Sequence, residues 1–228
     1  MVEIKSPSLH RLLRILIPAL LIPLTVAVGA LLLGGRHYLI FSLLVAVLAV
    51  VLFIAGFERK EIGTRRMVLV SVMIALSVVG RFIPFFKPVT ALTVIAAIAL
   101  GSEAGFLVGA FSALLSNFYF GQGPWTPFQM LAWGLVGLFA GLLSGALRKS
   151  RVLLLLFGVL SGAVFSAVMD LWTVLWYSES LSPDLYLSAL LAALPHTALY
   201  AASNFLFLFF LAKPFLRKLD RIRIKYGA

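Results

Sequence analysis

Polar side chains that could bind a ligand stand out in this chain because the segments around them are almost entirely apolar. Asp170 is the one acidic residue deep within an apolar segment. An ionised carboxylate is costly inside a bilayer, so this side chain should face a cavity or a partner. Asp170 is therefore a candidate substrate contact or proton-linked group. The alternative is a structural pair with His196 or with Arg81.

A second polar group lies along the last apolar segment of the chain. His196, Tyr200 and Asn204 recur every four residues, which places them on one face of a helix. Pro195 removes a backbone hydrogen bond and should free a carbonyl near Leu191, so we expect a kink there. We predict that this stripe faces inward, toward a ligand or toward hydrogen bonds with a neighbouring helix.

The stretch from Asn117 to Gly134 reads NFYFGQGPWTPFQMLAWG and contains no charged residue. Six aromatic residues surround a centre interrupted by glycine and proline, which favour a turn. A neutral, aromatic-lined loop suits a mostly apolar ligand that a few hydrogen bonds hold in place. An interfacial belt of aromatic residues is the alternative, but a belt leaves the two glutamines unexplained. The candidate substrate contacts from this loop and from a later segment are Asn117, Gln122, Trp125, Gln129 and Trp172.

These residues must be positioned by membrane helices. The chain is 62% hydrophobic and has a mean hydropathy of +1.10, whereas a soluble domain is about half apolar. A helix that spans a bilayer needs about 20 mostly apolar residues, and several segments meet that length. We therefore predict an all-α polytopic membrane protein, with spans at about 12–34, 38–57, 66–84, 88–101, 104–120, 127–147, 151–177 and 185–213.

The basic residues predict how these spans are oriented. The 19 Lys and Arg residues contribute to a net charge of +11, and they lie at helix ends rather than in a patch that would bind nucleic acid. With both termini inside, 16 of the 19 fall on the inner side, in agreement with the positive-inside rule. An odd number of spans would spoil this bias. We therefore predict eight helices, with the N-terminus and the C-terminus both cytoplasmic.

The charged segment ERKEIGTRR, residues 58–66, divides the chain into two predicted units. Residues 1–60 form an N-terminal transmembrane hairpin, and residues 61–228 form a six-helix membrane domain that holds nearly every polar intramembrane residue. Within this domain the span at 88–101 is short, about 20 Å at about 1.5 Å per residue. A short or interrupted helix is typical of a transport site, unless the boundary is misjudged.

An internal repeat relates two of the predicted helices. At a constant offset of 53, residues 105–119 match residues 158–172, and each copy begins with Gly-x-x-x-Gly. Asn117 then corresponds to Asp170. Chance similarity between glycine-rich helices is the alternative to a true repeat. Close helix packing is further predicted for three glycines spaced four apart, Gly137, Gly141 and Gly145.

Several function classes lack their motifs in this sequence. The absence of cysteine excludes disulfides and thiolate metal sites. Neither the P-loop pattern GxxxxGK[ST] nor HExxH or GxSxG is present, so neither ATP binding by a P-loop nor those catalytic motifs are available. No acid/base pair or nucleophile is assembled, which speaks against an enzyme. A stand-alone secondary transporter, coupled to protons through Asp170 and His196, and a membrane scaffold remain alternatives to a substrate-binding subunit.

Residues 65–228 resemble the substrate-binding S component of energy-coupling factor (ECF) vitamin transporters. The resemblance rests on the six-helix layout with both ends inside and on two segments. These are EAGFLVGAFSALLSNFYFGQGPWTPFQMLAWGLVGLFAGLL, residues 103–143, and SNFLFLFFLAKPFLRKLDRIRIKYG, residues 203–227. The Gly-Gln-Gly-Pro-Trp-Thr-Pro loop at residues 121–127 is the most specific part. The N-terminal hairpin is an addition to the six helices.

The resemblance implies a transport role in the plasma membrane. An S component captures a vitamin from the outer side and associates with a membrane coupling subunit and two ATPases, so the chain needs neither an ATP-binding motif nor a cofactor of its own. Family members dock through small residues four apart on the first core helix, and Ser71 and Ala75 have that spacing here, with serine in place of the usual alanine. The ligand lies under the outer loops, so the uncharged loop at residues 121–127 is expected to act as its gate.

The resemblance also suggests a substrate. The Gln/Trp/Pro loop is most similar to S components of the cobalamin-specific kind. A corrinoid has many amides and an apolar face, which an aromatic mouth would accommodate. A flavin, a pterin or a deazapurine would fit the same composition.

Overall fold

The computed structural model describes residues 16–32, 38–55, 64–178 and 182–226 of the 228-residue chain. These ranges contain ten α-helices and one short π-helical segment, with no strand, so the predicted all-α class is confirmed. The elements are η1 Ile17–Leu21, α2 Ile22–Leu32, α3 Tyr38–Ala55, α4 Thr64–Gly80, α5 Val89–Leu100, α6 Ser102–Phe120, α7 Thr126–Leu142, α8 Ser144–Lys149, α9 Arg151–Ser178, α10 Pro183–Ala192 and α11 Leu194–Tyr226.

Two of the predicted spans are each divided into two helices. The predicted span 127–147 breaks at Leu143 into α7 and α8, between Gly141 and Gly145, where the low helix propensity of glycine weakens the helix. The last span breaks at Ala193, whose N–H donates to the carbonyl of Ala189. This break lies two residues before Pro195, so the predicted kink is confirmed.

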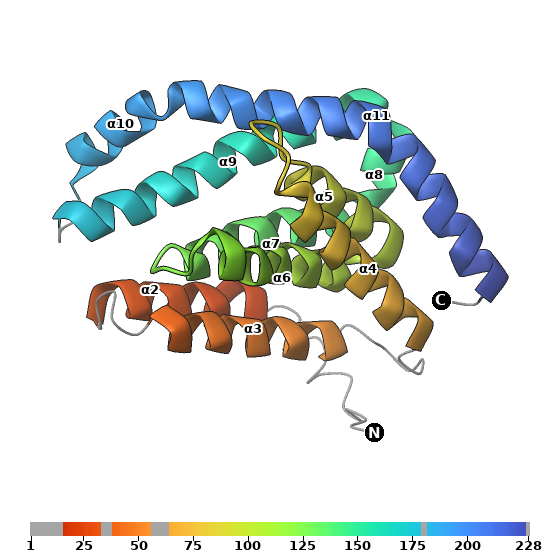
Figure 1. Cartoon of the computed structure of the whole chain (residues 1–228), viewed down its shortest axis with the longest axis horizontal. Coiled ribbons are helices and arrows are strands. Elements are labelled where there is room, and N and C mark those ends of the chain that lie inside the picture. Colours follow the sequence, from red (N-terminus) through yellow and green to blue (C-terminus); the bar gives the residue numbers. More distant parts are fainter. Residues whose placement is uncertain (1–15, 33–37, 56–63, 179–181, 227–228) are drawn as a thin grey trace.

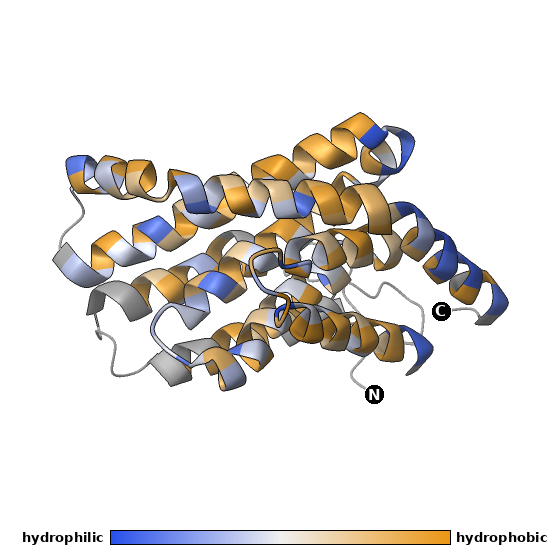
Figure 2. Cartoon of the chain, turned by 45° about the horizontal axis from the view of Figure 1, so that its top comes forward, coloured by the Kyte–Doolittle hydropathy of each residue, from blue (hydrophilic) through white to orange (hydrophobic). Residues whose placement is uncertain are grey.

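Two of the described helices are long and apolar enough to cross a bilayer by length and composition, Arg151–Tyr177 within α9 and Leu194–Ile222 within α11. Figure 2 shows that hydrophobic residues cover most of the length of the helices, while hydrophilic residues gather at the C-terminal end of α11. Two further apolar helices, α5 and α7, are shorter. The six-helix core and the orientation of the termini stay predictions.

The short helix α5 lies at the centre of the fold. It has 12 residues, every one of them buried, and at about 1.5 Å per residue it is about 18 Å long. Helices α4, α6, α7 and α11 all contact it, which agrees with its place among them in Figure 1. The predicted short span is therefore a short helix enclosed by protein, and its length is not an error of boundary.

Helices α6 and α7 pack at backbone distance along a line of glycines. A Cβ atom added at Gly137 would lie 2.2 Å from the carbonyl oxygen of Gly105, and one at Gly141 would lie 2.2 Å from the Cα atom of Ser102. The close packing predicted for these two α7 glycines is confirmed. The expectation for Gly145 is wrong within this chain, because that residue lies beyond the end of α7, on α8, and no atom lies within 4 Å of a Cβ placed there.

Helices α9 and α11 form the second close pair, again through glycine. A Cβ atom at Gly162 would lie 2.9 Å from the backbone nitrogen of Ala201. One turn away, the amide nitrogen of Asn204 donates to the carbonyl oxygen of Gly158 at 3.0 Å. Both copies of the predicted repeat thus use their Gly-x-x-x-Gly face for close packing, one against α7 and the other against α11.

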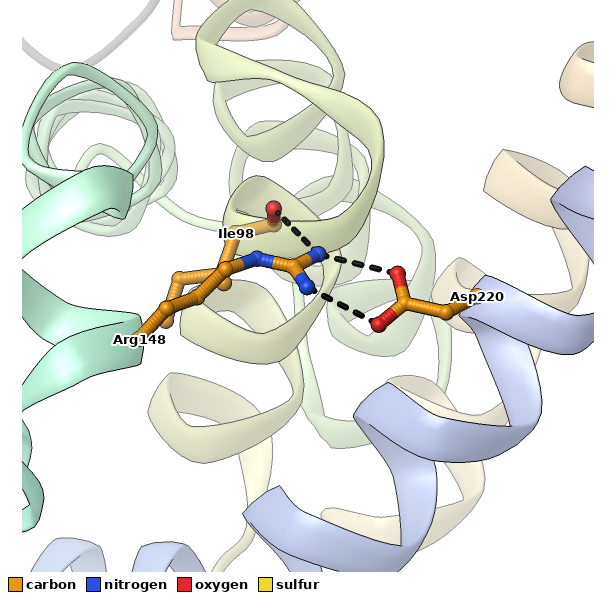
Figure 3. A network of polar contacts seen from close by, with 3 residues as sticks. All are labelled: Ile98, Arg148 and Asp220. Atoms are coloured by element: carbon orange, nitrogen blue, oxygen red, sulfur yellow. Dashed lines mark hydrogen bonds and ion pairs between the residues drawn. The ribbon is translucent and has the colours of Figure 1, made fainter.

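The N-terminal hairpin packs on this core. Helix α3 contacts α6 and α7, and α2 contacts α7 and α9; the hairpin runs along the bottom of Figure 1. At one end of the core, Arg148 of α8 donates to both carboxylate oxygens of Asp220 on α11, at 2.8 and 3.0 Å, and to the carbonyl of Ile98 on α5 at 3.1 Å (Figure 3). This cluster ties three helices together near the C-terminus.

Candidate functional site

The uncharged loop is held by a network of neutral side chains. The amide nitrogen of Asn117, at the end of α6, donates to Thr126 Oγ1 at 2.8 Å and to Gln129 Oε1 at 2.9 Å, both on α7. The Thr126 hydroxyl in turn donates to Gln122 Oε1 at 3.0 Å. Three of the predicted contacts therefore bond to one another or through one threonine. Asn117 is fully buried and all its polar atoms serve this network, so as a ligand contact it stays a prediction.

The backbone of the loop depends on one glycine beside a tryptophan. The ring of Trp125 folds over Gly123, where an added Cβ atom would lie 2.3 Å from the ring. The amide nitrogen of Gln122 donates back to the carbonyl of Leu114 at 2.9 Å. The loop is thus closed against α6 by the glutamine and covered by the tryptophan, which explains why it needs no charged residue.

Arg81, just beyond α4, reaches into the bundle beside this network. Its Nη1 atom donates to the hydroxyl of Ser116 and to Oδ1 of Asn117. Its guanidinium carbon lies 5.4 Å from the centre of the Trp133 ring, within the range of a cation–π interaction. Among the described residues no ion pair joins Arg81 to an acid, and this includes Asp170, which the sequence offered as its partner.

Aromatic rings connect Arg81 to α9 and α11. Trp133 stacks on Phe165 of α9 with ring centres 4.7 Å apart, and Phe165 lies 5.1 Å from Tyr200 of α11. The His196 ring meets Tyr200 edge-on at 4.7 Å. These four rings, from Trp133 to His196, form what is called here the aromatic band. It runs across α7, α9 and α11, with the Arg81 cation at its α7 end.

Tryptophans form a second group near the loop. Trp125 meets Trp172 of α9 edge-on, with ring centres 5.7 Å apart, and Trp172 stacks near Trp176 at 6.3 Å. A separate set of rings on the surface, Phe82, Tyr119 and Phe120, makes contacts of 4.6 to 5.1 Å among its own members. The exposed rings correspond to the aromatic belt that the sequence offered as an alternative, while Trp125 of the loop contacts Trp172 of α9.

Asp170 is half-buried on α9 and is held by neutral neighbours. Ser166, one turn earlier on α9, and His196 of α11 both lie close enough to interact with it electrostatically. The Thr197 hydroxyl donates to Ser166 Oγ at 2.6 Å, which links α11 to the same cluster. Of the two basic partners expected for Asp170, His196 is therefore the one that lies near it.

Three buried polar atoms on α7 and α9 have no hydrogen-bond partner among the described residues: the indole nitrogens of Trp133 and Trp172, and Oδ2 of Asp170. A buried polar atom without a partner costs about 1–3 kcal/mol. Such atoms in a native structure call for an unseen partner such as a ligand or water. The Trp133 donor belongs to the aromatic band, and the other two atoms lie further along α9, on Asp170 near His196 and on Trp172 beside Trp125.

The stripe predicted on the last helix does not face uniformly inward. Asn204 is fully buried against α9, Tyr200 is half-buried in the aromatic band, and His196 is exposed. The inward expectation for His196 is therefore corrected. The reason is its place near the start of α11, because no residue of α10 and none from 194 to 200 is buried, so this end of the helix pair lies at the edge of the packed core.

Sequence reasoning missed part of this region. The sequence predicted Arg81 only as a possible ion-pair partner of Asp170. It did not predict Trp133 or Phe165 as residues of the site. Trp133 could have been found, since it follows Trp125 and Gln129 at the same four-residue spacing. Nothing in the sequence marks Phe165 among the 19 phenylalanines of the chain.

The predicted docking residues lie on an exposed face of α4. Ser71 and Ala75 are both exposed. The large apolar side chains exposed on the same helix are Met67, Val68, Val72, Leu76 and Val79. Small residues set in an exposed apolar helix face allow another helix to approach closely.

Comparison with known proteins places the chain in a family. A family model described as "ECF-type riboflavin transporter, S component" matches residues 61–218. No curated protein and no solved structure matches the chain. S components are membrane-embedded transport subunits, not enzymes, that bind a vitamin and work with ECF membrane and ATPase modules. The match covers well over half of the chain and includes the loop, α9 and most of α11, so the chain belongs to the family of ECF transporter S components.

Proposed function

We propose that this chain captures a vitamin at the outer face of the plasma membrane and delivers it to a separate module with two ATPase subunits. The proposed ligand site lies between Arg81, the loop at residues 121–127 and the aromatic band. The observation that carries this proposal is the group of unpartnered polar atoms on Trp133, Trp172 and Asp170 beside that band. A ligand with hydrogen-bonding edges and a flat apolar face would satisfy them and stack on the rings.

A flavin is the ligand we favour. The matching family model is described by riboflavin, and a flat ring system suits a site whose walls are Trp133, Phe165 and Tyr200. The cobalamin preference drawn from the loop sequence has no support in these ring contacts. A corrinoid remains the competing ligand in the test.

Binding to the purified full-length protein tests this function. Riboflavin fluorescence should be quenched on titration with the protein, and native mass spectrometry should show one flavin per chain, with cyanocobalamin as the competitor. A Trp172→Leu variant should bind more weakly, because it removes a ring and an indole donor from the site. The matched control is Phe118→Leu, an aromatic residue exposed on the surface of α6. A cobalamin adduct without a flavin adduct would reassign the ligand, and no adduct with any vitamin would reject the proposal.

The coupling module is proposed to dock on the exposed face of α4 that contains Ser71 and Ala75. The loop at residues 121–127 is proposed to gate the site, and the network of Asn117, Thr126 and Gln129 supports a loop with a defined closed form. Net uptake should then require the ATPases, whereas ligand binding should not.

A stand-alone transporter coupled to protons is the second candidate, because Asp170 and His196 lie close enough to interact. It predicts pH-driven uptake in vesicles that contain this chain alone. The S-component proposal predicts binding without net uptake in the same vesicles, so one reconstitution separates the two candidates.

A further inference from the structure

Two cations lie together in the segment between α4 and α5. The guanidinium carbon of Arg81 is 5.0 Å from the centre of the Phe120 ring, and Nζ of Lys87 is 5.7 Å from the centre of the same ring. Among the residues that the structure describes, no acidic side chain pairs with either of them. Like charges held near one another at partly buried positions raise the free energy of the ligand-free protein.

Lys87 shows the effect of this crowding. Burial lowers its pKa first, and the nearby charge of Arg81 lowers it further. A negative group between the two side chains would counteract the lowering of the Lys87 pKa by Arg81. It would also offset the lowering by burial. The backbone position of Lys87 is also defined, because the Ser203 hydroxyl of α11 donates to its carbonyl oxygen at 3.1 Å.

Arg81 has donors to spare for such a group. Only its Nη1 atom is used, by Ser116 and Asn117. Its Nη2 and Nε atoms form no hydrogen bond within the described residues, and neither atom is fully buried. The ring of Trp133 lies under the guanidinium, and its indole N–H is fully buried and has no hydrogen-bond partner among the described residues. The free donors of this corner thus come from an arginine and a tryptophan, and they have no acceptor.

We infer that the ligand carries an anionic oxygen group, a phosphate or a carboxylate, which Arg81 and Lys87 hold beside Trp133. This inference rests on the proposed ligand site. The anion explains why two cations and a buried donor occupy one corner without an acidic partner. It makes Arg81 the residue that selects a charged ligand over its neutral analogue, while the aromatic band accepts the ring system of either.

Two flavins that differ only in charge test the inference. Riboflavin and riboflavin 5′-phosphate share one ring system, and only the second carries a phosphate. The full-length protein in a neutral detergent should bind the phosphate ester about tenfold or more tightly, since hydrogen bonds to charged groups are about twice as strong as neutral ones. The ratio of the two dissociation constants is the readout.

Three variants separate charge from geometry. Arg81→Gln should reduce the ratio to about one, and Arg81→Lys, which keeps the charge, should retain a preference for the ester. If the arginine variant does not fold, Lys87→Gln tests the charge again. This variant should fold, because the wild-type Lys87 side chain donates no hydrogen bond within the described residues. Lys149→Gln removes a cation at the end of α8, and it should leave the ratio as in the wild type. Thermal unfolding confirms that each variant is folded.

The outcomes distinguish this inference from the proposed function. Equal binding of both flavins by the wild type, or a ratio unchanged in Arg81→Gln and Lys87→Gln, overturns the inference and leaves flavin binding in place. If neither flavin binds but the carboxylate vitamins biotin or pantothenate do, with the same dependence on Arg81, the inference stands and the flavin assignment fails. Binding only of neutral pyridoxine, or of no vitamin, overturns it.

An anionic lipid headgroup is the other source of such a group. The flavin titrations should therefore be repeated in nanodiscs with and without phosphatidylglycerol. An unchanged ratio supports a soluble ligand. Loss of the preference with the anionic lipid would assign the two cations to a headgroup and overturn the inference.

Discussion

Asn117 donates from its side-chain amide to Oε1 of Gln129 at 2.9 Å, across the uncharged loop that separates α6 from α7. The same amide reaches Thr126, so both of its N–H groups bond to the start of α7. The polar residues of the loop thus form a bonded frame before any ligand arrives. A frame of this kind lowers the ordering cost of binding, because fewer side chains are immobilised when the ligand enters.

The first prediction concerns this frame. Asn117→Ala should lower both the unfolding temperature and the affinity for the ligand, because Gln129 Oε1 loses its hydrogen-bond donor while Arg81 and Thr126 each lose one of their partners. Each group left unpaired costs about 1–3 kcal/mol. Thermal unfolding in detergent and ligand titration measure the two effects. Phe118→Ala, an exposed residue on the same helix, is the control, and equal behaviour of the two variants would contradict the prediction.

The second prediction concerns the glycine packing of α6 and α7. Gly137→Ala should destabilise the protein by about 1–3 kcal/mol or prevent its folding, because the new methyl group overlaps the backbone at Gly105. Gly145→Ala is a matched control, since open space surrounds that position. Expression level and thermal unfolding in detergent are the measurements. A Gly137→Ala protein as stable as Gly145→Ala would show that the two helices do not pack this closely.

The third prediction concerns the half-buried acid of α9. Asp170→Asn should weaken ligand binding by several-fold, about 1 kcal/mol, without unfolding the protein, because the amide keeps the size of the side chain and loses its charge and one acceptor. Isothermal titration measures the affinity, and thermal unfolding reports the fold. Asp184→Asn, an exposed acid on α10, should bind as the wild type does. Unaltered affinity in Asp170→Asn would remove this residue from the site.

The fourth prediction concerns the ion pair of α8 and α11. Arg148 and Asp220 are each about one-third exposed, 35% and 36%, so Arg148→Gln should lower the free energy of unfolding by no more than about 1 kcal/mol. The hydrogen bonds that Arg148 donates to the Asp220 carboxylate raise the pKa of Arg148 above its usual value. A raised pKa stabilises the fold at every pH below the unfolded value and is lost only above it.

The stability difference between the wild type and Arg148→Gln should therefore stay constant between about pH 6 and pH 9, since the arginine is charged throughout that range. Unfolding measured at several pH values checks this expectation. A difference that falls steadily as the pH rises through this range would mean that the pair does not act through the arginine charge. High salt should reduce the difference, because the pair is partly exposed.

The fifth prediction concerns the face of α4. Ser71→Trp should prevent assembly with the membrane coupling subunit while ligand binding by the isolated chain persists, because the bulky ring blocks close approach of another helix. Co-purification with the coupling subunit measures assembly. Val152→Trp on α9, which replaces another exposed apolar residue, should assemble normally. Equal assembly of both variants would place the docking surface elsewhere.

The sequence by itself determined the class of this protein and most of its helices. Apolar length, the short α5 and the proline kink near Ala193 are local properties, because they follow from hydrophobicity and from the missing N–H of proline. The glycine spacing of α6, α7 and α9 likewise indicated which faces pack closely. The motifs of the loop at residues 121–127 carried the resemblance to S components, which the family match confirms.

Only the tertiary structure decided what the polar residues do. Gln122 and Gln129 look alike in sequence as ligand contacts, yet both bond to other residues of the loop frame. Arg81 became central because the end of α4 lies beside Asn117 and Trp133, residues 36 and 52 positions away in the chain. Burial, hydrogen-bond partners and electrostatic neighbours depend on such distant segments meeting in space, and no local pattern records them.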